Sequence, residues 1–353
     1  MDTKVEDIYS IIKDYHCDEA DGSPISTESI IQWINQFDTN DRDFITDELL
    51  HLLRQDIYVS KAKALELLSS FVQNFPSLLG YNDLSDCVKQ TEFICVQKPQ
   101  KSQCVLLELL DSIILEKCGF SLNAYSDNAK KNYIYIDDIM ASGGTFCNDI
   151  HNYVKTQNLL DKIKSKEIKF LSYFFCEHTW GSNNARYILK NKFNGDSLFL
   201  EPKLFPIFSD YKIENNIRAV RDKLNLVYPT KSKSTYDDYL ANINSDRQAE
   251  KAYRGANQPS IESFFRSSEN RLKLEQIFLD KGIEIISKIA DDDIRSKHRP
   301  LGKTYPSYKT FGTGTMFFTW RNVSNTCPIV FWWNVSGHGW IGLFPLKNRG
   351  IKI

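Results

Sequence analysis

Residues 132–145 read Asn-Tyr-Ile-Tyr-Ile-Asp-Asp-Ile-Met-Ala-Ser-Gly-Gly-Thr, and this stretch decides how the rest of the chain is interpreted. Residues 133–136 are aromatic or β-branched without a polar break, which predicts a short strand buried on both faces. Two carboxylates, Asp137 and Asp138, follow at once, and a helical run occupies residues 146–154. We therefore expect a strand, an acidic pair, a small-residue loop and a helix in succession.

The loop between the acids and the helix has the chemistry of a phosphate site. It consists of Ala141, Ser142, Gly143, Gly144 and Thr145. The glycines lack a Cβ, so backbone N–H groups can approach an anion closely. The two hydroxyls add donors, with Thr145 as the expected N-cap, and the positive end of the helix dipole would lie at the same point. The acids suit ribose hydroxyls or a hydrated Mg²⁺. The alternative is an ordinary strand-to-helix turn with acidic capping residues.

Two common nucleotide motifs are excluded by this pattern. No Gly-Lys-Ser/Thr follows the glycines, as a Walker loop requires, and a Rossmann fingerprint has its acid a strand later. Residues 136–145 instead resemble, position for position, the 5-phosphoribosyl-1-pyrophosphate (PRPP) motif of type I phosphoribosyltransferases. That motif is a hydrophobic strand, Asp-Asp, two apolar residues and a small/hydroxyl-Gly-Gly-Thr loop.

Composition is that of an ordinary globular chain of one to three domains. Of its 353 residues 42% are hydrophobic and 25% are charged, and the net charge of -1 gives no global basic field for nucleic acid. No apolar run is long enough for a bilayer, and the acidic N-terminus lacks a signal core, so we expect a cytoplasmic protein. The eight cysteines show no Cys-x-x-Cys or zinc spacing, and we expect reduced, buried thiols.

Residues 1 to about 90 show helical periodicity. Apolar residues recur at helical spacing in three runs, of which the first contains Trp33 and the third follows Ser60. An aromatic residue on a helix stripe favours a core position for Trp33 over a stacking role. We interpret the region as a helical layer packed on the catalytic sheet, or as a contact surface for another subunit.

A second strand is expected at residues 92–97, followed by a polar loop and a leucine-rich helix over residues 106–114. In type I phosphoribosyltransferases, the loop after the first core strand holds pyrophosphate, and this segment lies one strand-helix unit before the acidic motif. Lys98, Lys101 and Ser102 are therefore candidate pyrophosphate ligands. The loop is poorer in glycine than is usual, and the alternative is a pair of solvated lysines.

A third strand, at residues 168–176, is expected to end beside the acids, because ligands lie at the carboxyl ends of the strands in an open α/β sheet. This makes His178 and Trp180 candidates for the pocket that binds the acceptor, with a structural loop as the alternative for each. Residues 197–200 are the candidate for a further strand.

Three other segments of the chain carry separate expectations, two about the exclusion of solvent and one about a helix. Residues 118–131 leave little room for the flexible hood that many type I enzymes carry. Residues 231–239 are the best candidate for a mobile lid, with a surface excursion as the alternative. A helix is expected over residues 271–289, with an interruption near Gly282.

The C-terminal quarter differs in character. Alternating apolar and polar residues, with an Asn/Ser turn between two runs, predict a hairpin of the strands 316–320 and 328–333. Arg299 is a candidate ligand for an anionic substrate or acceptor, or a residue that pins the hairpin. The ensemble of Arg-Pro-Leu-Gly at 299–302, Phe-Gly at 311–312, Arg-Asn at 321–322 with Asn325, and Pro-Ile-Val-Phe-Trp-Trp resembles the C-terminal signature of the PRTase-CE family. These proteins are phosphoribosyltransferase-like effectors of bacterial conflict systems, including some retron anti-phage systems.

The resemblance implies an α/β fold with a type I phosphoribosyltransferase-like open parallel sheet flanked by helices. It adds an N-terminal helical layer and a C-terminal β-hairpin extension. The expected segments are a helical region at 1–90, the phosphoribosyltransferase-like core at 91–212, and a helical and hairpin extension at 213–353.

The implied function is that of an effector enzyme of an anti-phage defence system that acts at C1 of a ribose 5-phosphate, as PRPP or a nucleotide. Mg²⁺ is the implied cofactor, near Asp137 and Asp138, which would be the catalytic residues. The implied partner is a retron reverse transcriptase with its RNA–DNA hybrid, or a second copy of the chain. No association with a membrane is implied. The alternative is a catalytically inactive PRPP or nucleotide sensor, or a scaffold subunit of a defence complex.

Overall fold

The computed structural model of the protein describes residues 2–18, 24–99, 101–126, 128–195, 201, 205–215, 223–243, 252–290, 295, 298–303, 309–335 and 337–346. The chain forms two compact units, one of residues 61–212 and one of residues 1–60 together with 213–353. The segments 1–90, 91–212 and 213–353 expected from the sequence group the residues differently. The expected strand at residues 197–200 lies outside the described residues.

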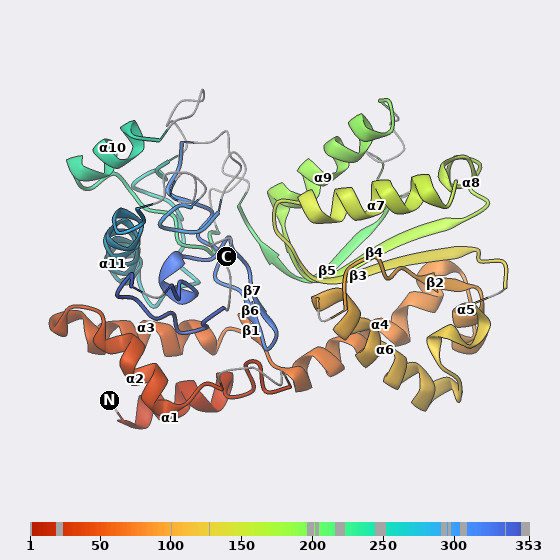
Figure 1. The fold of residues 1–353 in the computed structure, drawn as a ribbon, viewed down its shortest axis with the longest axis horizontal. Coiled ribbons are helices and arrows are strands. Elements are labelled where there is room, and N and C mark those ends of the chain that lie inside the picture. The colour runs from red at the N-terminus through yellow and green to blue at the C-terminus, as the bar shows by residue number, and fades with distance from the viewer. Residues whose placement is uncertain are drawn as a thin grey trace. The chain divides into compact units, whose positions relative to one another are not determined.

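The unit of residues 61–212 is built on a four-stranded sheet in the order β2 (Thr91–Phe93), β3 (Asn132–Met140), β4 (Lys169–His178) and β5 (Ile207–Ile213). The pairs β2–β3 and β3–β4 are parallel, with Asn132 opposite Thr91 on one side and Lys169 on the other. Helices cover both faces, which confirms the expected α/β sheet flanked by helices (Figure 1).

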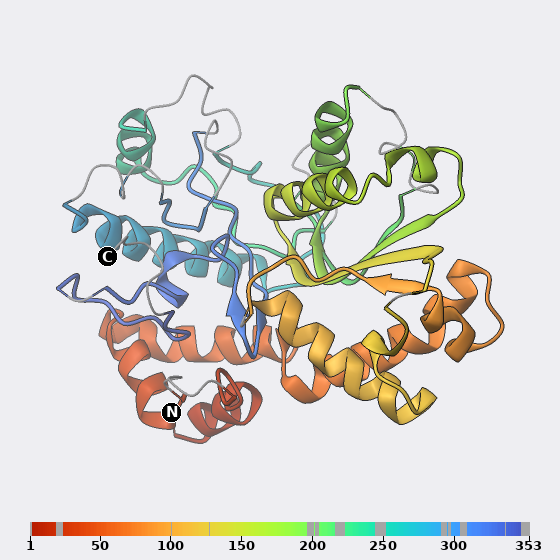
Figure 2. The ribbon, with the colours of Figure 1, turned by 45° about the vertical axis from the view of Figure 1, so that its right-hand side comes forward.

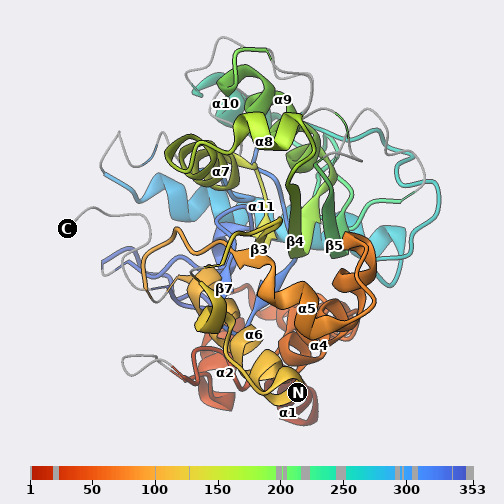
Figure 3. The same cartoon turned by 90° about the vertical axis from the view of Figure 1, so that its right-hand side faces the viewer.

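One face of the sheet carries α4 (Lys61–Leu79) and α6 (Ser102–Cys118), with α5 (Leu84–Lys89) and the 3₁₀ turn η2 (Leu122–Tyr125) beside β2. The other face carries α7 (Gly144–Thr156), α8 (Leu160–Lys164) and α9 (Thr179–Lys192) (Figures 1, 2 and 3). On the first face Phe71 of α4 stacks on Tyr173 of β4, with ring centroids 4.3 Å apart. Helices α4 and α5 are thus the parts of the expected helical layer that pack on this sheet.

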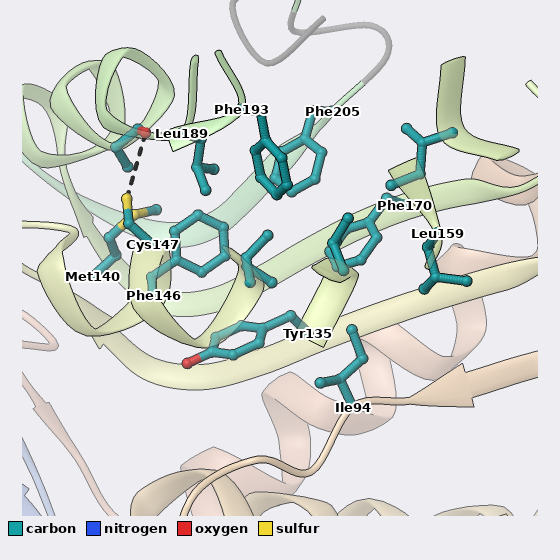
Figure 4. Close-up of a cluster of buried hydrophobic side chains, with 14 of the residues drawn as sticks. Ile94, Tyr135, Met140, Phe146, Cys147, Leu159, Phe170, Leu189, Phe193 and Phe205 are labelled. Carbon is teal, nitrogen blue, oxygen red and sulfur yellow. Dashed lines mark hydrogen bonds between the residues drawn. The ribbon is translucent and has the colours of Figure 1, made fainter. Parts of the chain in front are cut away.

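The core under α7 is a cluster of aromatic and aliphatic side chains, in which the ring of Tyr135 lies among Phe146, Phe174 and their neighbours (Figure 4). Burial of such side chains is the main favourable term in folding, at about 25 cal/mol per Å² of apolar surface. Because this core continues to Met140, β3 is longer than the sequence predicted. Both acids therefore lie within the strand, and not after it.

The other unit joins the two ends of the chain. Its helices are α1 (Asp2–Ile12), α2 (Thr27–Asn35), α3 (Arg42–Leu53), α10 (Ser234–Ala241) and α11 (Ser268–Ser287), with the 3₁₀ turns η1 (Thr39–Asp41) and η4 (Ile329–Phe331). In its three-stranded sheet β1 (Tyr58–Val59) runs parallel to β6 (Phe318–Thr319), which pairs antiparallel with β7 (Asn322–Val323). Trp33 is a core residue, as expected: it is fully buried, and its Nε1 donates to the carbonyl of Val330 at 2.8 Å.

Two expectations in this unit need correction, and a third, the lid, stays a prediction. The hairpin exists, but its second strand is β7, while residues 329–331 form a 3₁₀ turn whose carbonyl at Val330 accepts from buried indoles. Helix α11 runs through Gly282 without a break. The glycine is there for close packing, because a Cβ on it would lie 2.8 Å from Pro300. The candidate lid at 231–239 overlaps α10, whose Tyr236 is buried.

Candidate active site

The loop after β3 turns into α7 at Gly143. This residue has a φ of +76° and is the N-cap, so α7 begins at Gly144 and Thr145 lies inside the first turn. The expected N-cap at Thr145 is therefore wrong, because the left-handed backbone conformation that ends the loop is one that glycine adopts readily and a β-branched residue does not. The first turn of α7 presents the N–H groups that a helix leaves without intrahelical partners.

Helix α9 fixes the shape of this loop from one side. A Cβ on Gly181 would lie 1.9 Å from the carbonyl oxygen of Ala141, and a Cβ on Gly143 would lie 2.8 Å from the Cβ of Ala185. Asn184 adds a hydrogen bond from Nδ2 to the carbonyl of Ser142 at 3.1 Å. The loop is thus held by the start of α9, a role of Gly181 that the sequence analysis missed because the two segments are far apart in the chain.

The other side of the loop is open. Ser142 and Thr145 are exposed, and Gly144 is half-buried. The N–H of Gly144 donates to Oγ of Ser142 over 3.4 Å, which is a long hydrogen bond that an anion could readily replace. Two hydroxyls and the first amides of α7 are therefore available at the surface for an oxyanion.

Asp137 is buried, with 7% of its surface exposed, and both its carboxylate oxygens accept hydrogen bonds from the protein. Oδ1 accepts from the Ser102 hydroxyl at 2.7 Å and from the N–H of Asp138 at 2.9 Å. Oδ2 accepts from Nε2 of Gln97 at 2.8 Å, and it lies 3.3 Å from the Tyr135 hydroxyl, whose single proton it shares with Asp149. The structure thus brings Ser102, the first residue of α6, to Asp137, together with Gln97 and Tyr135.

A third acid, Asp149 of α7, shares this network. Its Oδ2 accepts from the Tyr135 hydroxyl at 2.9 Å and from Nε2 of Gln97 at 3.3 Å. Gln97 and Tyr135 therefore bridge Asp137 and Asp149. The sequence analysis missed these three residues; the one local signal was an acid two turns into the helix that follows the loop.

Burial changes the pKa values of the acids in this network. Burial, and then the charge of Asp138, raise the pKa of Asp137 to about 7, although Ser102 and Gln97 favour its ionised form. Burial also raises the pKa of Asp149, against the hydrogen bonds from Tyr135 and Gln97. The carboxyl group of Asp137 therefore has a pKa near neutral pH, where a group can both donate and accept a proton.

The remaining predicted residues lie in different surroundings. Asp138 is buried and accepts at Oδ1 from the N–H of Ile139 at 2.8 Å. Lys98 and Lys101 are exposed on the loop that leads into α6, of which Ser102 is the first residue.

His178 is the last residue of β4 and is fully buried, and burial lowers its pKa to about 3, so its imidazole is neutral. Trp180 lies half-buried in the first turn of α9. Arg299 belongs to the unit with the chain ends, where its Nη1 donates to the carbonyl of His298. Arg299 therefore stays a prediction as a member of the acceptor pocket.

Two wider properties concern metals and membranes. Within the described ranges, no cluster of three or more His, Cys, Asp or Glu side chains is arranged to hold a metal ion. None of the helices in the described part of the chain combines the length and the apolar composition that crossing a membrane requires.

Comparison with known proteins gave one match. Neither the curated proteins nor the solved structures contained a significant relative. The PRTase-CE family model matches residues 30–346, which include the acidic strand, the loop, α9 and the C-terminal hairpin. Because this match covers most of the chain and the sheet has the expected parallel order, the protein belongs to the PRTase-CE family of phosphoribosyltransferase-like proteins.

Proposed function

We propose that the protein is a phosphoribosyltransferase-like enzyme that acts at C1 of a ribose 5-phosphate, supplied as PRPP or as a nucleotide. The observation that carries this proposal is the open loop of Ser142, Gly144 and Thr145 at the start of α7, which directly follows the strand that contains the acidic pair. Hydroxyls and helix N–H groups suit a phosphate, and carboxylates suit sugar hydroxyls.

Each part then has a role in the chemistry. Displacement of pyrophosphate or a base from C1 builds positive charge on the sugar ring, as in other glycosyl transfers. Such a reaction depends on positioning and on electrostatics more than on a nucleophile of the enzyme. The loop would hold the 5-phosphate, the acids would hold the sugar and offset the ring charge, and the segment of Lys98, Lys101 and Ser102 would face pyrophosphate.

Mg²⁺ is the proposed cofactor, near Asp137 and Asp138. Mg²⁺ binds one or two carboxylates and completes its six ligands with water and phosphate oxygens. Oδ1 of Asp137 accepts two hydrogen bonds and Oδ2 accepts one from Gln97, so this residue would have to give up a donor to bind metal. When bound, Mg²⁺ would offset the charge of the departing pyrophosphate.

The biological role that we propose is that of an effector in anti-phage defence. Its support is family membership, together with the resemblance of the C-terminal quarter to conflict-system effectors. A reverse transcriptase with its RNA–DNA hybrid is the proposed partner, and His178 and Trp180, at the end of β4, are the proposed acceptor side of the site.

A sensor or scaffold without catalysis is the second candidate. The occupied carboxylate of Asp137 favours it, because a sugar must compete there with Ser102 and Gln97. Lys98 and Lys101, the candidate pyrophosphate ligands, are also exposed on a loop that is poor in glycine.

The two candidates are separated by following the reaction directly. The protein is incubated with PRPP and Mg²⁺, with and without cell extract, and mass spectrometry follows pyrophosphate and any molecule that gains ribose 5-phosphate. An enzyme releases pyrophosphate or forms such a product, and Asp138→Asn stops both. A protein that binds PRPP but leaves it intact under every condition is the sensor.

A further inference from the structure

The two ends of the segment 97–102 meet on one carboxylate. Gln97 donates to Oδ2 of Asp137 at 2.8 Å, and Ser102 donates to Oδ1 of the same residue at 2.7 Å. Lys98 and Lys101 lie between these two contacts and are exposed. The carboxylate of Asp137 therefore accepts a hydrogen bond from each end of the segment that carries both lysines.

The sheet holds this segment through a second side chain. Gln103 is buried, its Oε1 accepts from the N–H groups of Val96 at 2.9 Å and Gln97 at 3.2 Å, and its Nε2 donates to the carbonyl of Ile136 at 3.4 Å. The backbone at the start of the segment is thus fixed to the strand residue that precedes Asp137. Because the backbone is already held there, the bonds of Asp137 orient the Gln97 side chain and the start of α6.

The two acids differ in their surroundings. Successive side chains of a strand point to opposite faces, so Asp137 shares a face with Tyr135 and Asp138 does not. Asp137 accepts from Ser102, Gln97 and the N–H of Asp138, and it shares the single proton of the Tyr135 hydroxyl with Asp149. A carboxylate has about four acceptor sites in all, so most of those on Asp137 are filled by the protein.

We propose that, of the two acids assigned above to the sugar, Asp137 is instead a positioning residue that anchors the segment 97–102, which leaves the sugar contact to Asp138. This inference rests on the proposed function for the identity of the ligand. Asp149 and Tyr135 support the anchor, because both lie within hydrogen-bond distance of the same Gln97 Nε2, at 3.3 Å and 3.2 Å.

The anchor is tested by two binding measurements on Asp137→Asn and Asp138→Asn. Ribose 5-phosphate lacks pyrophosphate, so an acid that positions the pyrophosphate segment affects PRPP alone. For Asp137→Asn we expect about tenfold weaker PRPP binding, the equivalent of one hydrogen bond, and ribose 5-phosphate binding within about twofold of wild type. For Asp138→Asn we expect both ligands to bind at least about tenfold more weakly. Equal losses of ribose 5-phosphate binding in the two variants would overturn the division of roles.

Hydrogen exchange provides a readout that needs no ligand. Asp137→Asn and Ser102→Ala should both speed amide exchange over residues 96–104, while Asp138→Asn should leave it unchanged. Unchanged exchange in Ser102→Ala and Asp137→Asn would overturn the anchor even if PRPP binds. If the wild-type protein binds neither ligand but the exchange results hold, the proposed function fails and the anchor survives.

A different observation on the same segment carries a second inference. The Sγ atoms of Cys95 and Cys104 lie 3.3 Å apart, on either side of the segment 97–102. Cys95 is exposed and Cys104 is half-buried, whereas Cys87, Cys147, Cys176 and Cys327 are buried as the sequence analysis expected. Burial, and then the contact with Cys95, raise the pKa of Cys104 to about 11. Cys95 is thus the accessible thiol of the pair and Cys104 the resolving one.

We infer that Cys95 and Cys104 are an oxidation site that closes to an intramolecular disulfide. The oxidant is a low-molecular-weight disulfide such as oxidised glutathione. The Cys95 thiolate attacks it, forms a mixed disulfide and releases one thiol. Cys104 then attacks the Cys95 sulfur, releases the second thiol and completes the bond. The protein loses two protons and two electrons, and the oxidant gains them as two thiols.

Mass spectrometry of the protein after treatment with oxidised glutathione tests this site. We expect a peptide that joins Cys95 to Cys104, restored to two thiols by dithiothreitol, while the exposed Cys17 forms a mixed disulfide. Cys104→Ser should trap the mixed disulfide on Cys95. A wild-type protein in which Cys95 keeps glutathione, or in which both thiols stay reduced while Cys17 reacts, would overturn the inference.

Discussion

Gly181, in the first turn of α9, packs directly on the carbonyl of Ala141, so that a Cβ at position 181 would lie 1.9 Å from that oxygen. The start of one helix thereby sets the backbone of the loop that leads into another. The shape of the proposed phosphate site depends on this contact, because a side chain at position 181 would displace the backbone of the loop at Ala141.

Gly181→Ala should therefore destabilise the protein and weaken PRPP binding together. We expect a loss of about 1–3 kcal/mol in the free energy of unfolding, as for other overpacked sites. Urea unfolding and calorimetric titration measure the two effects. Gly144→Ala is the matched control for stability, because its Cβ would meet Ser142 Oγ at an ordinary 3.6 Å. Equal stability of the two variants would contradict the packing argument.

Asp137→Asn should make stability less sensitive to pH. Because burial raises the pKa of Asp137 to about 7, against about 3.9 in an unfolded chain, the folded protein holds this proton more tightly between those values. The resulting stabilisation is complete below about pH 4 and is lost as the pH rises through about 7. Relative to wild type, Asp137→Asn should gain at most about 4 kcal/mol between pH 4 and pH 8. A difference that is flat with pH would show that Asp137 has an ordinary pKa.

Trp33 should be among the most sensitive positions of its unit. It is fully buried, stacks on Phe331 with centroids 5.5 Å apart, and donates to the carbonyl of Val330. Trp33→Ala should cost about 3–5 kcal/mol of unfolding free energy. Trp33→Phe keeps an aromatic ring but leaves the carbonyl without this donor, and should cost less. Urea unfolding of both variants checks the order, and a loss below about 1 kcal/mol for alanine would contradict it.

A buried ion-pair group in the same unit gives a fourth prediction. The Glu275 carboxylate accepts three hydrogen bonds: from Nη2 of Arg254 at 2.8 Å, from Nη1 of Arg271 at 3.3 Å and from the N–H of Tyr228 at 3.0 Å. Glu275→Ala leaves two buried guanidinium groups without this partner and should cost about 3–5 kcal/mol. Glu66→Ala, which breaks the exposed pair with Lys63, should cost no more than about 1 kcal/mol. Similar losses in thermal unfolding would contradict the role of burial.

The order of elements around the site was predictable because its signals are local. An unbroken apolar run indicates a buried strand, and Gly-Gly before a helical pattern indicates a tight loop, so β3, the loop and α7 follow from residues 132–154. The family resemblance rested on the same local pattern and on the C-terminal quarter, and the family match confirmed it.

The contacts that give these residues their properties were not predictable in this way. Gln97 reaches Asp137 across 40 residues of sequence, and Gly181 meets Ala141 only once α9 packs on α7. The wrong hairpin strand at residues 328–333 has the same cause. Its apolar pattern fits a strand, but buried indoles from Trp33 and Trp340 take the Val330 carbonyl. Side-chain hydrogen bonds between distant segments leave no periodic mark in a sequence.

The most direct test of the phosphate loop is a calorimetric titration of PRPP, with Mg²⁺, into wild type, Thr145→Glu and Asn148→Glu. Both positions are exposed on α7, so either glutamate adds the same charge to the same helix. At Thr145 it would repel the 5-phosphate, whereas Asn148 lies almost one turn further from the loop. We predict that wild type and Asn148→Glu bind PRPP, and that Thr145→Glu binds at least about tenfold more weakly. Equal binding by Thr145→Glu and wild type, or no binding by wild type, would contradict a phosphate site in this loop.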